Sequence, residues 1–159
     1  MHLIRQALAD RPADRQRVRI LVDRHTLGRR LWRATAEDGT DFGFELAEPL
    51  RHGDAVFDTG EKLYVIDQAP EPVLRIPIGP TAEAAAIVGW AVGNMHFTIQ
   101  ACGDHITAPD DPGLRQMLDR IGRPYTTDEA VFEPHRFAAV VGHTHGHAED
   151  AAHPFIRPA

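Results

Sequence analysis

The pattern of apolar and polar positions divides the chain into two parts with different rhythms. Residues 18–73 alternate short β-branched or aromatic runs (VRILVD, DFGFEL, AVFD and KLYVID) with turn signals, which are the glycine dipeptides Asp38-Gly39, Gly53-Asp54 and Thr59-Gly60. Such runs are typical of short strands, and Asp-Gly is typical of a hairpin turn. The pattern predicts a small all-β domain over residues 1–70, with Pro70 and Pro72 marking its boundary because proline interrupts strand pairing.

From Val73 on, helical and strand periods alternate. The run VLRIPI predicts a strand whose internal proline favours a sheet edge. Thr81 predicts the start of a helix over AEAAAIVGWAVG, with Gly93 as its end. The next run, MHFTIQA, alternates strictly and predicts a strand that places His96 on the face opposite the helices.

The remaining elements complete a recognisable order. DHIT predicts a hairpin partner across Gly103, and Asp110 or Asp111 predicts the start of a second helix with the apolar stripe Leu114, Met117, Leu118 and Ile121. Gly122 ends that helix, and PYTTDEAVF predicts a last strand. The fold class is therefore α+β: an all-β domain, then a ferredoxin-like βαββαβ domain over residues 71–138, then a mobile histidine-containing tail over residues 139–159.

Composition narrows the function classes. The chain has 159 residues, a net charge of −6 and no basic block, so a nucleic-acid partner is not expected. No apolar run approaches the roughly 20 residues of a membrane span, and charge interrupts the N-terminus before a signal-peptide core could form. The single Cys102 excludes an intramolecular disulfide framework. We expect a cytoplasmic protein without a membrane partner.

Histidine is the one compositional outlier. Four of the ten histidines lie within the last twenty residues: His143, His145, His147 and His153. In an extended segment the alternating three would share one side and could converge on a cation, for which imidazole suits zinc, copper and nickel. The alternative interpretation is a solvated tail whose histidines have no ligand.

Further candidate ligands lie within the predicted second domain. A lone histidine such as His96 is most often a structural hydrogen-bonding group, but a C2 dimer would bring two copies of it face to face. Cys102 and His105 form a C-x2-H pair across a predicted turn, although a free or buried cysteine is the simpler interpretation. His135 lies between the last strand and the tail and could join either group.

Catalytic motifs are missing from the sequence. It contains no H-E-x-x-H, Gly-rich phosphate loop or G-x-S-x-G, and only twelve residues follow His147 to supply the further ligands of a zinc hydrolase. A mobile tail also lacks the rigid support that a catalytic metal needs. We expect a protein that is not an enzyme.

The segments GWAVGNMH, FTIQ, GLRQML and VFEP, followed by the histidine-rich end, resemble the UreE family of urease accessory proteins, which are nickel metallochaperones. Residues 28–76 also resemble the N-terminal β domain of that family. The resemblance implies a homodimer in which His96 of both subunits is the central Ni²⁺ ligand and the tail histidines are mobile supplementary ligands. It further implies delivery of Ni²⁺ to the urease apoprotein with its accessory GTPase, and an N-terminal domain that engages protein partners.

Some positions depart from the family pattern. Met95 stands where Arg is common, and Asp110, Asp111 and Pro112 stand where some members carry histidines. The possible secondary ligands are therefore His135, His105, Cys102 and His153, and Zn²⁺ or Cu²⁺ could compete with nickel. The main alternative function is a dimeric protein-interaction module with an incidental histidine tail, and a zinc-dependent hydrolase is a distant third.

Overall fold

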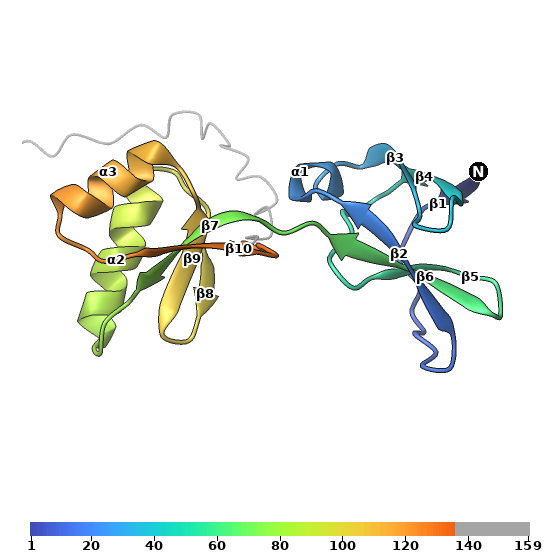
Figure 1. The fold of residues 1–159 in the computed structure, drawn as a ribbon, viewed down its shortest axis with the longest axis horizontal. Helices are drawn as coiled ribbons and strands as arrows, with labels where there is room; N and C mark the ends of the chain where they lie inside the picture. Colours follow the sequence, from blue (N-terminus) through green and yellow to red (C-terminus); the bar gives the residue numbers. More distant parts are fainter. Residues whose placement is uncertain (136–159) are drawn as a thin grey trace, which may run out of the picture.

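The computed structural model describes residues 1–135, which form two lobes, each with its own buried cluster (Figure 1). The combination of three sheets with three helices within the described residues confirms the α+β class. The predicted tail, with His143, His145, His147 and His153, lies outside the described residues. No helix within residues 1–135 is long and apolar enough to cross a bilayer.

The first lobe consists of two three-stranded sheets and one short helix. One sheet has the order β1-β4-β3, from β1 (His2–Ile4), β4 (Asp41–Glu45) and β3 (Leu31–Thr35). The other has the order β2-β6-β5, from β2 (Gln16–Val22), β6 (Lys62–Gln68) and β5 (Ala55–Asp58), and α1 (Arg24–Leu27) follows β2. Alternate residues of β2 are buried, which places its apolar side chains in the core between the sheets.

The predicted Asp-Gly hairpin joins β3 to β4, with Gly39 at a φ of +86°. Its Asp38 carboxylate accepts hydrogen bonds from Lys62 Nζ at 2.8 Å and from the Tyr64 hydroxyl at 3.0 Å. The bond from Lys62 lowers the pKa of Asp38 well below its usual range. The turn chemistry therefore also ties the tip of one sheet to the central strand of the other.

The second lobe has the chain order β-α-β-β-α-β. Its elements are β7 (Glu71–Pro77), α2 (Ala82–Asn94), β8 (Gln100–Cys102), β9 (His105–Pro109), α3 (Pro112–Arg120) and β10 (Thr126–Ala130). The four strands form an antiparallel sheet in the order β10-β7-β9-β8. Leu74 and Ile76 of β7 pack with Val88, Val92 and Leu118 of the helices in one buried cluster.

The prediction of an edge position for the proline-containing strand is wrong, because β7 lies between β10 and β9. Its two prolines, Pro72 and Pro77, occupy the second and last positions of the strand. A missing N–H near a strand end interrupts little of the ladder, so the central position is tolerated.

The helix starts follow the predicted capping chemistry. The Thr81 hydroxyl accepts a hydrogen bond from Ala84 N at 3.2 Å. Of the two candidate aspartates, Asp111 is the N-cap of α3, whereas Asp110 accepts a hydrogen bond from Arg115 Nε at 2.6 Å. That ion pair lowers the pKa of Asp110.

The two lobes share a junction that extends beyond the covalent link. Gln68 Nε2 donates to the Phe132 carbonyl at 2.8 Å, and both groups are buried. Arg24 forms a two-pronged ion pair with Glu71, at 2.7 and 2.9 Å, and its guanidinium lies 5.1 Å from the centre of the Phe132 ring. The segment after β10 therefore contacts the first lobe before it continues along the second.

We expect Leu118→Ala to lower the free energy of unfolding by about 2–5 kcal/mol, because Leu118 is 1% exposed within the core of the second lobe. Ile121→Ala is the matched control, since Ile121 is 44% exposed despite its place in the predicted apolar stripe. Its effect should stay below about 1 kcal/mol. Urea unfolding at one protein concentration measures both, and equal losses would contradict this assignment of the core.

Candidate metal centre

His96 lies just after the end of α2 and is exposed to solvent. Its N–H donates to the Gly93 carbonyl at 2.9 Å, and its φ of +63° makes it the one non-glycine residue with positive φ in the described part of the chain. Residues held in this left-handed region cost free energy and gather at functional sites. The backbone thus holds this imidazole outward at the end of a helix.

The predicted strand over MHFTIQA is wrong in its first half. The helix continues past Gly93 to Asn94, and only Gln100–Cys102 is paired as β8. Met95, Phe97 and Ile99 nevertheless pack against the core of the second lobe, as the alternation predicted. The alternation therefore predicted correctly which side chains of residues 95–99 are buried. These residues form an irregular connection and not a strand.

An apolar stripe runs along the outer side of α2 toward His96. Ala86, Ile87 and Trp90 are exposed, with Trp90 at 70% and Ile87 at 46%. The spacing of three and four residues places them on one side of the helix. Val88 and Val92 face the core on the other side. A helix that is apolar on both sides is normally covered on both, and residues 1–135 cover only one.

The segment that leads into residues 136–159 lies along the free edge of β8. Glu133 N donates to Gln100 Oε1 at 3.0 Å, and His135 N donates to the Ile99 carbonyl at 2.9 Å. Ala101 N donates in turn to His135 Nε2 at 3.4 Å, so this ring nitrogen already has a partner. Ile99 is three residues from His96, and the C-terminal segment therefore starts beside the connection that carries His96.

Cys102 and His105 are paired across the β8–β9 hairpin, on either side of its turn. His105 Nδ1 lies 2.7 Å from Asp104 Oδ1, and this hydrogen bond lowers the pKa of Asp104. The side chain of His105 is 21% exposed, and Cys102 is half-buried.

The structure does not bring the described candidate ligands together into one set. Within residues 1–135, no group of three or more His, Cys, Asp or Glu side chains is arranged to hold a metal ion. His96, His135 and the Cys102–His105 pair are thus separate places on the second lobe. Within residues 1–135, none of these places offers a cation more than two protein ligands.

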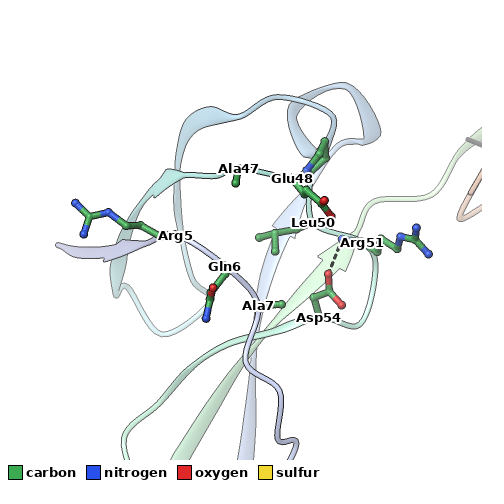
Figure 2. A pocket seen from close by; sticks show the side chains of 9 residues that line it. Arg5, Gln6, Ala7, Ala47, Glu48, Leu50, Arg51 and Asp54 are labelled. Carbon is green, nitrogen blue, oxygen red and sulfur yellow. Dashed lines mark hydrogen bonds between the residues drawn. The ribbon is translucent and has the colours of Figure 1, made fainter. Parts of the chain in front are cut away.

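A hollow with a volume of about 480 Å³ lies elsewhere, in the first lobe (Figure 2). Arg5, Gln6, Glu48 and Arg51 contribute polar groups to its wall, and the Arg51 backbone N–H donates to Asp54 Oδ2 at 2.8 Å. None of the predicted metal ligands among the described residues lines this hollow. It provides no alternative metal centre.

Comparison with known proteins matches residues 71–155 to the model of the UreE urease accessory protein, C-terminal domain. Three proteins named urease accessory protein UreE are similar to the chain. The Ralstonia nicotianae protein is 34% identical over 72% of this chain and 55% of its own length. The Corynebacterium efficiens protein is 33% identical over 79% and 83%, and the Chelativorans protein is 27% identical over 95% and 96%.

These matches cover more than half of the chain and include the segment with His96, the β8–β9 hairpin and the start of the C-terminal segment. Their family consists of accessory proteins in urease maturation, which confirms the expectation that the chain is not an enzyme. The chain belongs to the UreE urease accessory protein family.

Proposed function

We propose that this protein is a cytoplasmic nickel metallochaperone that carries Ni²⁺ to the urease activation complex. His96 of two subunits supplies the central ligands, and His143, His145 and His147 supply supplementary ones. The single observation that supports the proposed metal site most directly is the position of His96. It is exposed in a left-handed turn at the end of an apolar helix stripe, where a second copy of the chain can dock.

The homodimer in this proposal is formed by the outer side of α2. The predicted strand would instead have placed His96 on the sheet face opposite the helices. Trp90 and Ile87 supply apolar area, which association would remove from water. A two-fold axis near the end of the stripe places the two His96 imidazoles opposite each other, because a C2 interface pairs identical patches. Two ligands thus come from one sequence position.

The C-terminal segment starts close enough to contribute further ligands. His135 is fixed at the β8 edge beside Ile99, and His143 follows eight residues later. An extended chain of that length reaches about 28 Å at most. The three alternating histidines are therefore within reach of a site at His96.

The arrangement suits delivery better than storage. Nickel stands high in the Irving–Williams order, so tight binding is easily achieved and release is the harder task. Ordering each residue of a free segment costs about 1–2 kcal/mol, which weakens the hold of supplementary ligands and lets them leave one at a time. Zn²⁺ and Cu²⁺ fit the same imidazole set and would compete.

The proposal assigns a role to each part of the chain. Residues 1–70 form a β domain that engages the urease apoprotein and its accessory proteins, including the accessory GTPase. Residues 71–138 form a ferredoxin-like metal-binding domain, and residues 139–159 form a flexible histidine-rich tail. The two separate buried clusters and the strand order β10-β7-β9-β8 support the division into a β domain and a ferredoxin-like domain.

We expect the metal-free protein to be a dimer at micromolar concentration and Trp90→Glu to be a monomer, because a charge in the centre of an apolar interface is costly. Ile121→Glu is the matched control, since it places the same charge on an exposed apolar position of the second lobe outside the α2 stripe. Sedimentation velocity distinguishes them. A dimer that survives Trp90→Glu would exclude α2 as the interface.

We expect His96→Ala to abolish the tightest Ni²⁺ site, because one substitution removes two ligands from the dimer. Replacing His143, His145 and His147 together with Ala should leave a weaker site at His96, since ligands already fixed by the fold lose less entropy on binding. Calorimetry at neutral pH measures both variants. Complete loss of nickel binding in the tail variant, with binding retained in His96→Ala, would reverse the assignment.

We compare two variants of His96 in the metal-free protein. The free energy of unfolding of His96→Gly should exceed that of His96→Ala by about 0.5–1 kcal/mol, because glycine adopts positive φ without the steric cost of Cβ. Both variants should lack the tight nickel site. Thermal unfolding in chelator, at equal protomer concentration, compares them. Equal stability of the two variants would mean that the turn at residue 96 relaxes without cost.

A further inference from the structure

The tip of the β8–β9 hairpin places the only cysteine of the chain opposite a histidine. Cys102 and His105 are direct partners in the antiparallel register, so their side chains share one face and their Cβ atoms lie about 4.5–5.5 Å apart. That face is directed away from the helices, because Ile106, the next residue after His105 on β9, points to the other face and packs into the core. A cation with ligand distances of about 2.3 Å to sulfur and 2.0–2.1 Å to nitrogen can bridge such a pair.

The imidazole is already oriented for a cation. An ionised Asp104 carboxylate can only accept, so His105 Nδ1 carries the proton of the 2.7 Å hydrogen bond. The lone pair of the neutral ring then lies on Nε2. A carboxylate that holds the distal nitrogen of a ligating histidine is the usual support of a metal site in proteins.

The thiol has a comparable support. The Thr107 hydroxyl lies 3.7 Å from Cys102 Sγ, and Thr107 is only 5% exposed. A buried hydroxyl at this distance can donate to a thiolate and stabilise its charge. The thiol also donates to the Gln100 carbonyl at 3.8 Å, and loss of its proton would break that bond. Cys102 itself is half-buried and therefore still open to an ion from solvent.

We propose that Cys102 Sγ and His105 Nε2 form a second metal site for a thiophilic divalent cation such as Zn²⁺, Co²⁺ or Ni²⁺. Binding replaces the thiol proton, which is released to solvent, with an S–metal bond. Asp104 and Thr107 are positioning residues. Two protein ligands leave the other coordination positions to water. This site requires neither His96 nor the dimer.

The test is a Co²⁺ titration of the reduced full-length protein. Because the chain has one cysteine, a thiolate-to-cobalt charge-transfer band in the near ultraviolet reports this site alone. We expect the band in the wild type and its loss in Cys102→Ser. His105→Ala should weaken the apparent Co²⁺ affinity at least about 100-fold, and Asp104→Asn about tenfold.

Two controls keep the site separate from the proposed nickel centre. His96→Ala should retain the band, and His25→Ala, an exposed histidine of the first lobe, should leave the titration unchanged. As a second measurement, Zn²⁺ should slow iodoacetamide alkylation of Cys102 in the wild type and in His96→Ala but not in His105→Ala. No band at saturating Co²⁺, a band indifferent to His105→Ala, or a band lost in His96→Ala would each overturn the proposal.

Discussion

Helix α2 has apolar side chains on two sides, and residues 1–135 bury only one of them. Val88 and Val92 lie in the core of the second lobe, whereas Trp90 and Ile87 remain exposed. The hydrophobic effect therefore favours an association that covers the outer stripe. The helix ends in the left-handed turn at His96. An association through the exposed stripe of α2 would therefore also bring the His96 residues of two chains close together.

The short strand β8 organises the rest of the second lobe. On one edge it pairs with β9, which places Cys102 opposite His105. On its free edge it holds His135, where the C-terminal segment starts. Backbone hydrogen bonds fix both arrangements. Three places with metal-ligand chemistry therefore lie along one continuous stretch of chain: His96, then Ile99 with His135 beside it, then the Cys102–His105 pair at the hairpin turn. The fold thereby holds the candidate ligands His96, Cys102, His105 and His135 in fixed positions on the second lobe.

The sequence by itself determined the features that depend on local chemistry. The cap at Thr81 follows from one side-chain hydrogen bond, and the turns at Gly39 and Gly103 follow from a positive φ. The sequence also located the start of α3 to Asp110 or Asp111, and the structure shows that Asp111 is the cap. The order of strands and helices and the buried side of residues 95–99 follow from the period of the apolar positions. The candidate ligand His96 was also identified from its sequence neighbours, through the family resemblance.

Only the tertiary structure decided how these elements meet. Sequence period placed His96 on a strand, but continuation of α2 to Asn94 and the hydrogen bond from His96 N to Gly93 place it in a helix-terminal turn. Proline suggested an edge for β7, but pairing with both β10 and β9 places it in the centre of the sheet. The position of His135 beside Ile99 depends on contacts between residues far apart in sequence, which no local pattern encodes.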